Sequence, residues 1–139
     1  MLKKFSVENF KGFHNKLTFD LEADNFDFNP EVIENNCISK GIIYGVNGSG
    51  KSNLGLAIFD IIIHLTERQK LIHSYDFYLN MSNSNSVANF EYEFIFDGHD
   101  VVYKYSKNNA NMVYCNVRRN KLCFIKNLIN LVLFLSLFF

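Results

Sequence analysis

Apolar and polar residues alternate one by one in several parts of the chain, which is the pattern of a strand that buries one face. The turns between these parts are short and contain glycine or asparagine, so they favour antiparallel neighbours. The alternation predicts an N-terminal hairpin of two strands and a later β-meander of three strands. In order, the predicted strands are residues 2–8, 17–21, 90–96, 101–105 and 112–117.

The middle of the chain has two other patterns. Residues 42–44 form a continuous apolar run that stops at Gly45, which predicts a strand buried on both faces. From Lys51 to about His73, apolar residues recur at helical spacing and predict one long amphipathic helix. Together these elements predict an α/β fold: a mixed sheet around the central strand, one long helix and an antiparallel β-meander.

Composition supports a folded chain and limits its partners. The 139 residues are 48% hydrophobic and 20% charged, which is enough for the core of one domain. Lys and Arg together number 14, as do Asp and Glu, so the formal net charge is zero. This balance excludes the broad basic field of a protein that binds nucleic acid by charge alone, although it does not exclude a local basic patch.

Cysteine and histidine usage predicts neither disulfides nor a metal site. The three cysteines form no C-x-x-C pair, and their odd number favours the reduced thiols of a cytoplasmic protein. The N-terminus becomes polar before any apolar run develops, so it does not resemble a secretory signal. The histidines are far apart and have no acidic or Cys companions at ligand spacing. These residues are Cys37, Cys115, Cys123, His14, His64, His73 and His99.

One motif carries chemistry, because residues 45–52 match the pattern G-x-x-x-x-G-K-[ST]. They are Gly45, Val46, Asn47, Gly48, Ser49, Gly50, Lys51 and Ser52. The glycines permit positive φ and a close approach to phosphate, so successive backbone N–H groups can converge into an anion nest. The apolar run before the motif and the helix after it supply the expected context. The alternative is a glycine-rich turn with an incidental Lys-Ser pair.

The motif predicts binding of ATP together with Mg²⁺. Lys51 is long enough to reach the β- and γ-phosphates, and the Ser52 hydroxyl can bind the Mg²⁺ ion that bridges them. The N-terminal end of the helix adds a positive potential at the same place.

Other nucleotide-handling motifs are incomplete. Asn120-Lys121 begins the base-reading motif of GTPases but the required Asp does not follow, so GTP selectivity is not supported. Asp97 ends an apolar strand like a Walker B aspartate, yet the next residue, Gly98, assigns it to a hairpin turn. Asp60 lies within the predicted helix. No catalytic residue is therefore predicted.

These segments resemble the N-terminal part of the head domain of ABC-type ATPases of the RecF, structural-maintenance-of-chromosomes and OLD-like group, also called AAA family ATP-binding proteins. In that group a first strand ends in Asn-Phe-(Arg/Lys), a second strand follows, and Gly-x-Asn-(Gly/Ala)-(Ser/Ala)-Gly-Lys-(Ser/Thr)-(Asn/Thr) forms the phosphate loop. The later hairpin 90–105 is similar to the antiparallel sheet of these heads. The resemblance covers residues 1–117 and is carried by Asn9-Phe10-Lys11, the strand 17–21 and the segment from Ile42 to Asn53 and Leu54.

The resemblance implies the N-terminal lobe of a P-loop NTPase head, in which Lys11 and Asn53 join residues 45–52 at the nucleotide. The alternative for Lys11 is an ordinary solvated turn lysine. Such heads hydrolyse ATP only as dimers, and their signature motif, Walker B pair, D-loop and switch histidine lie in a second lobe that this chain does not contain. A homodimer of heads and DNA are the partners that the family implies, with roles in DNA repair, chromosome handling or phage defence.

Residues 118–139 form a C-terminal tail, of which residues 127–139 are almost all apolar and are interrupted only by Asn127, Asn130 and Ser136. Three interpretations stay open: a frameshifted or truncated end of the reading frame, a membrane anchor, and a buried element of the fold. The anchor interpretation needs about 20 apolar residues, and the run here is shorter. With a shifted frame, residues 1–117 would be a partial head. The runner-up function is a non-catalytic fragment or membrane-associated interaction module.

Overall fold

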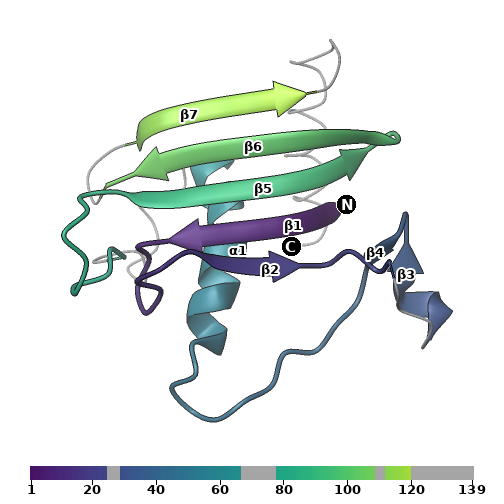
Figure 1. Cartoon of the computed structure of the whole chain (residues 1–139), viewed down its shortest axis with the longest axis horizontal. Coiled ribbons are helices and arrows are strands. Elements are labelled where there is room, and N and C mark those ends of the chain that lie inside the picture. The colour runs from purple at the N-terminus through teal and green to yellow at the C-terminus, as the bar shows by residue number, and fades with distance from the viewer. Residues whose placement is uncertain (25–28, 67–77, 109–111, 120–139) are drawn as a thin grey trace.

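The computed structural model describes residues 1–24, 29–66, 78–108 and 112–119, the last of these ranges by its backbone alone. A five-stranded sheet has helix α1 across one of its faces (Figure 1). Its order is β2-β1-β5-β6-β7. The elements are β1 (Leu2–Glu8), β2 (Leu17–Asp20), η1 (Pro30–Val32), β3 (Ile33–Glu34), β4 (Cys37–Ile38), α1 (Lys51–Thr66), β5 (Ala88–Phe96), β6 (His99–Lys107) and β7 (Met112–Arg119).

The local pairings predicted from the alternation are confirmed. β1 and β2 form an antiparallel hairpin, and β5, β6 and β7 are consecutive antiparallel neighbours. The turn between β5 and β6 consists of Asp97 and Gly98, both with positive φ. Two such residues are typical of the tight hairpin turn whose twist matches that of the strands. Asp97 therefore belongs to the turn, as its glycine neighbour predicted.

One pairing joins segments that are far apart in sequence. β1 lies antiparallel to β5, with Phe5 opposite Tyr92 and Val7 opposite Phe90. These four side chains are buried between the sheet and α1. In β5 every second residue from Ala88 to Phe94 is buried, as a strand with one covered face requires. The β1–β5 pairing thus merges the hairpin and the meander into one sheet with one core.

Helix α1 begins at Lys51, as the change of period predicted, and its apolar face packs on this core. The expected extension to about His73 lies partly outside the described residues, which include the helix as far as Thr66. The five apolar positions at helical spacing all contact the core: Leu54, Ile58, Ile61, Ile62 and Leu65.

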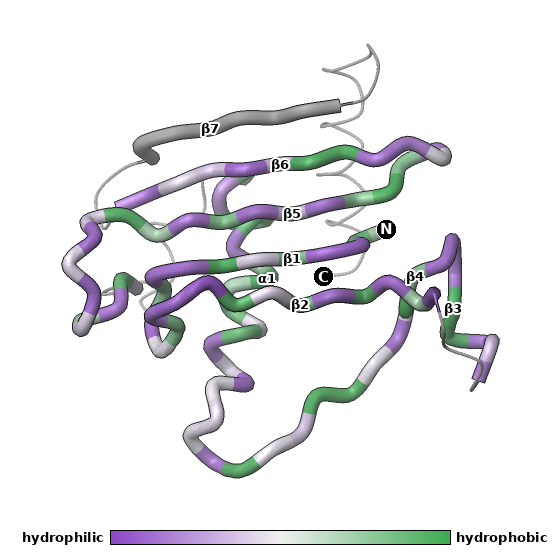
Figure 2. The backbone as a smooth tube through the Cα atoms, viewed as in Figure 1, coloured by the Kyte–Doolittle hydropathy of each residue, from purple (hydrophilic) through white to green (hydrophobic). Residues whose placement is uncertain are grey.

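The strand predicted at residues 42–44 is not formed, and this part of the sequence prediction was wrong. Residues 39–50 are the connection that leads from β4 to α1 (Figure 1). Figure 2 shows the hydrophobic residues of this connection away from the sheet. Ile42 and Tyr44 are each 91% exposed. Every pairing in the described sheet is antiparallel, so the predicted mixed sheet is also wrong for the described strands.

The physical reason lies in the order of the strands. A strand needs a free edge of a neighbouring strand with which to form its hydrogen bonds. In the five-stranded sheet, β1 already lies between β2 and β5. The apolar run therefore has no position beside β1, and it instead spans the distance between β4 and the start of the helix.

This arrangement makes a sharp prediction for two isoleucines. Ile42→Ala should change the free energy of unfolding by less than about 0.5 kcal/mol, because the side chain is exposed. Ile61→Ala should cost about 2–5 kcal/mol, because Ile61 is buried in the core. Urea unfolding of both variants measures the contrast. Equal losses for the two would show that residues 42–44 are buried in solution.

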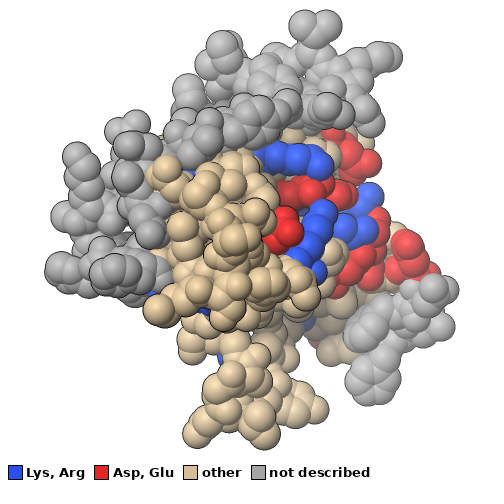
Figure 3. All heavy atoms as spheres, turned by 60° about the vertical axis from the view of Figure 1, so that its left-hand side comes forward, with Lys and Arg blue, Asp and Glu red and all other residues tan. Residues whose placement is uncertain are grey.

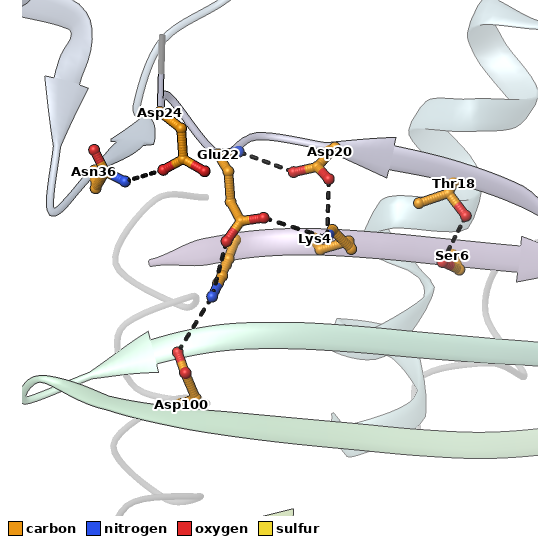
Figure 4. A network of polar contacts seen from close by, with 9 residues as sticks. Lys4, Ser6, Thr18, Asp20, Glu22, Asp24, Asn36 and Asp100 are labelled. Atoms are coloured by element: carbon orange, nitrogen blue, oxygen red, sulfur yellow. Dashed lines mark hydrogen bonds and ion pairs between the residues drawn. The ribbon is translucent and has the colours of Figure 1, made fainter.

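Ion pairs of Lys3 and Lys4 join β1 to β2, to the segment that follows β2 and to β6 (Figure 4). The Lys4 ammonium lies 2.9 Å from Asp20, and the Lys3 ammonium lies 2.9 Å from Glu22 and 3.8 Å from Asp100. Hydrogen bonds from these lysines hold the pKa of the Glu22 carboxyl below its usual value. Asp20, Glu22 and Asp100 each have a lysine ammonium beside them, and Asp24 accepts a hydrogen bond from the Asn36 side chain, which indicates a structural role for these charges.

The predictions about the C-terminal tail lie almost entirely outside the described residues, because residues 120–139 are not among them. Within the described part of the chain, no helix has the length and apolar character needed to cross a bilayer.

Candidate functional site

The glycine loop, defined here as residues 45–52, turns sharply before it enters α1. Gly48 has φ of +81° and Gly50 has φ of +94°, conformations that glycine adopts without strain. The Ser49 amide donates to the Val46 carbonyl oxygen over 3.3 Å, which closes the turn. The Leu54 amide donates to the Gly50 carbonyl oxygen over 2.9 Å, the first hydrogen bond of the helix.

The Lys51 side chain folds back onto this loop. Its ammonium donates to the carbonyl oxygens of Gly45 and Val46 over 2.7 and 2.8 Å. The Ser49 hydroxyl oxygen lies 3.4 Å from the same nitrogen. The loop therefore holds a positive charge at the N-terminal end of a helix, where the helix dipole is also positive. Both features favour an anion at this place.

Close contacts within the loop leave little room for larger residues. A Cβ atom on Gly45 would lie 3.2 Å from the Ser49 hydroxyl oxygen. A Cβ atom on Gly50 would lie 3.4 Å from the Phe13 ring, in addition to the strain of its positive φ. The positive φ of Gly50 therefore disfavours any larger residue there, whereas Gly45 is restricted by its contact with the Ser49 side chain.

The turn after β1 lies against the same loop. Phe13 contacts Gly50, and a Cβ atom on Gly12 would lie 3.3 Å from the Asn53 side-chain nitrogen. The backbone amide of Lys11 donates to the Tyr78 carbonyl oxygen over 2.5 Å, and the Asn80 side chain donates to the Lys11 carbonyl oxygen over 2.5 Å. The structure thus brings the turn that carries Lys11 next to the glycine loop, from 34 or more residues earlier in sequence.

The remaining residues predicted for the site are exposed. Asn47 and Ser52 both present their side chains to solvent, and Val46 is exposed although it is apolar. The structure thus places the segment from Gly45 to Asn53 next to the turn that carries Lys11. No group of three or more His, Cys, Asp or Glu residues that could hold a metal occurs among the residues that the structure describes.

A second group of polar side chains, which the sequence reasoning did not identify as a cluster, lies buried between α1 and the sheet. The Asp60 carboxylate accepts from the Lys107 ammonium over 2.6 Å and from the Tyr105 hydroxyl over 2.5 Å. The Tyr92 hydroxyl donates to the Ala57 carbonyl oxygen over 2.8 Å. Residues Asp60, His64, Tyr92, Tyr105 and Lys107 are called the helix–sheet polar cluster below.

A sequence signal for this cluster exists. Asp60 interrupts the apolar face of the helix beside Ile61, and Lys107 continues the inward series of Tyr103 and Tyr105 on β6. A charged residue on each of two facing apolar surfaces indicates an internal ion pair, since an isolated buried charge is too costly. Burial raises the pKa of the Asp60 carboxyl, and the Lys107 ammonium opposes that rise.

His64 makes the stability of the fold depend on pH. Its ring stacks on Tyr105, and burial, aided by the Lys107 ammonium, lowers its pKa to about 4. The unfolded chain takes up this proton near pH 6.5, before the folded chain does. Stability should therefore be lost as the pH falls from about 6.5 to 4. Urea midpoints across this range should fall less steeply in His64→Phe than in wild type.

His99 provides the matched control for this prediction, because it is exposed at the start of β6. Comparing His99→Phe with His64→Phe shows whether the loss of slope is specific to the buried histidine. A His64→Phe profile with the same slope as wild type would contradict the assignment of this proton uptake to His64.

Charges on the surface are mixed. Figure 3 shows Lys side chains interspersed with Asp and Glu side chains on the charged part of the face in view. On the outer side of the sheet, Glu91 lies 2.5 Å from the Lys104 ammonium and 3.2 Å from that of Lys16. A shallow cavity of about 240 Å³ lies beside these residues, and its other polar side chains include Ser6, Glu8, Asn89 and Ser106.

Comparison with known proteins adds no assignment. No protein-family model matches the chain, and a search of curated proteins finds none that matches it.

Proposed function

We propose that the chain binds ATP with Mg²⁺ through residues 45–53. One observation carries this proposal above the others: the Lys51 ammonium is held against the glycine loop at the N-terminus of a sixteen-residue helix. A cation, a helix dipole and backbone that can approach closely converge there, and these are the features that phosphate binding requires.

The proposal assigns a role to each part of the site. Lys51 exchanges a loop carbonyl for the oxygens of the β- and γ-phosphates, which are stronger acceptors because they are charged. The exposed Ser52 hydroxyl ligates Mg²⁺, and the glycines bring their amides close to the phosphates. Lys11 adds a second positive charge from the neighbouring turn.

Hydrolysis is proposed to need a second lobe, as the resemblance to ABC-type and AAA family ATPase heads implies. The two aspartates considered from the sequence have other positions in the fold. Asp60 is 0% exposed and bonded to Lys107. Asp97 lies in the β5–β6 turn, at a different place in the chain from the loop. Membership of that family, a dimer of heads and DNA as a partner all stay proposals.

The test is a titration of the full chain with a fluorescent ATP analogue, in Mg²⁺ and again in excess EDTA. Saturable binding that weakens on removal of Mg²⁺ is expected. A signal that does not saturate, or that is the same with and without the metal, would contradict the proposal.

A second candidate function is an interaction module that binds no nucleotide. The observation that favours it is the exposure of the consecutive residues Ile42, Ile43 and Tyr44, since adjacent exposed apolar residues often mark a contact surface. This module would bind lipid vesicles or another protein equally well with and without ATP. Co-sedimentation with vesicles in the absence of saturable nucleotide binding would favour it over the first function.

A further inference from the structure

The buried ion pair of the helix–sheet polar cluster joins the proposed nucleotide helix to the sheet at one defined point. Asp60 is 0% exposed and Lys107 is 2% exposed. Both carboxylate oxygens of Asp60 are bonded, one to the Lys107 ammonium and the other to the Tyr105 hydroxyl. The Lys107 ammonium also lies over the rings of Tyr78 and Phe90, at 5.1 and 5.5 Å from their centroids.

Net stability is a weak explanation for such a pair. Taking two charges out of water costs several kcal/mol each, and well-packed apolar residues at the same positions are often as stabilising. The pair can instead restrict the orientation of the helix on the sheet, because hydrogen bonds have narrow angular requirements whereas apolar contacts do not. The Tyr92 hydroxyl, which donates to the Ala57 carbonyl oxygen, adds a second directional contact to the same helix.

Besides these contacts, the helix has one more polar contact to β6, where His64 Nε2 lies 2.9 Å from the Tyr103 hydroxyl oxygen. The residues that it packs against the sheet near Asp60 are Ala57, Ile58, Ile61 and Ile62, which are small or aliphatic. Aliphatic surfaces of this kind tolerate small rotations and shifts. The ion pair would favour one of the helix orientations that these apolar contacts permit.

A rotation of α1 at Asp60 would also move the end of the glycine loop, because Lys51 and Ser52 belong to the same helix. Lys51 and Ser52 lie nine and eight residues before Asp60, which corresponds to about 12–14 Å along the axis. A rotation of about 20° would move an atom 5 Å from the axis by about 2 Å. Mg²⁺ demands ligands at about 2.1 Å in near-octahedral geometry, so such a movement would remove a ligand from its position.

We propose that the Asp60–Lys107 pair is a positioning element that fixes the rotation of α1 on the sheet and thereby aims the Ser52 hydroxyl at the Mg²⁺ of a bound nucleotide. The claim that the pair aims Ser52 at Mg²⁺ rests on the proposed function. The claim that the pair fixes the rotation of α1 on the sheet rests only on the contacts described above.

The test replaces both charges with apolar residues of similar size, in Asp60→Leu/Lys107→Met. The matched control is Glu91→Leu/Lys104→Met, which removes an ion pair from the outer side of the sheet. Urea midpoints show whether each variant folds. If the first variant fails to fold, Asp60→Asn/Lys107→Met replaces it, because the amide oxygen still accepts from Tyr105.

Two measurements decide the outcome. The first is the gain in affinity for the ATP analogue on addition of Mg²⁺, which should fall at least fivefold in the Asp60/Lys107 variant and stay within twofold in the control. The second is the amide NMR spectrum of residues 51–66, which should show one set of resonances in wild type and several sets, or broadened ones, in the variant. A merely structural pair would change neither quantity in a variant with the wild-type urea midpoint.

The outcomes separate the two proposals. An unchanged Mg²⁺ gain together with one set of helix resonances in the folded variant would overturn the positioning role. If the wild-type chain bound no nucleotide, the proposed function would fail and with it the aiming of Ser52. The NMR comparison would still support or refute the control of the helix orientation.

Discussion

Lys51→Ala is expected to weaken binding of the Mg²⁺-ATP analogue roughly 10- to 150-fold. The Lys51 ammonium donates directly to two carbonyl oxygens of the glycine loop. A hydrogen bond to a charged group contributes about 1.5–3 kcal/mol. A difference of about 1.4 kcal/mol is tenfold in the dissociation constant. Equilibrium titration of both proteins under identical salt and Mg²⁺ conditions measures the effect.

Lys40→Ala is the matched control, because Lys40 is exposed in the same connection but lies outside the glycine loop. It removes the same charge and should leave the affinity within about twofold, as expected for a screened surface charge. Both variants should unfold at the wild-type urea concentration. Equal affinity of Lys51→Ala and wild type would eliminate phosphate binding at this loop.

Asp60→Ala should lower the free energy of unfolding by about 3–5 kcal/mol, the cost of removing one partner from a buried ion pair. The substitution leaves the Lys107 ammonium, 2% exposed, without its carboxylate acceptor. It also removes the acceptor of the Tyr105 hydroxyl. Urea unfolding at pH 7 measures this loss, which is a large share of the stability of a chain this size.

Glu91→Ala provides the comparison for the buried pair. Its carboxylate lies as close to Lys104 as Asp60 lies to Lys107, but Lys104 is about half exposed. A surface pair contributes about 0–1 kcal/mol, so the expected loss is several times smaller than that of Asp60→Ala. Similar losses for the two variants would show that the Asp60–Lys107 pair is hydrated in solution.

Local patterns in the sequence were sufficient to predict most of the helices and strands. The alternation in β5 comes from side chains on opposite faces of one strand, and the apolar face of α1 comes from its helical period. The Asp97-Gly98 turn is equally local, because positive φ at two consecutive positions depends on those residues alone. Such features can be read from a short window of residues.

The failure at residues 42–44 has a different origin. An apolar run of isoleucine and tyrosine predicts a buried strand only if other strands lie beside it. The neighbours of β1 in the sheet are β2 and β5, one of them more than 80 residues away from the start of the chain. Their positions are set by contacts between distant segments, and no local pattern contains this information.

One part of the candidate site could be predicted from the sequence and the other part could not. The glycines, Lys51 and Ser52 are adjacent in sequence, so their spacing predicted that they would act together. The approach of the Lys11 turn to Gly50 and Asn53 depends on the packing of Phe13 against the loop. The sequence offered only a resemblance for that approach.

By itself, then, the sequence determined the strands of the hairpin and meander, the start of the helix and the glycine loop, because each depends on residues close together in the chain. Only the tertiary structure decided that β1 pairs with β5, that residues 42–44 remain exposed and that Asp60 meets Lys107. The physical reason is that burial and ion pairing depend on which distant surfaces come into contact, whereas backbone periodicity and turn conformation do not.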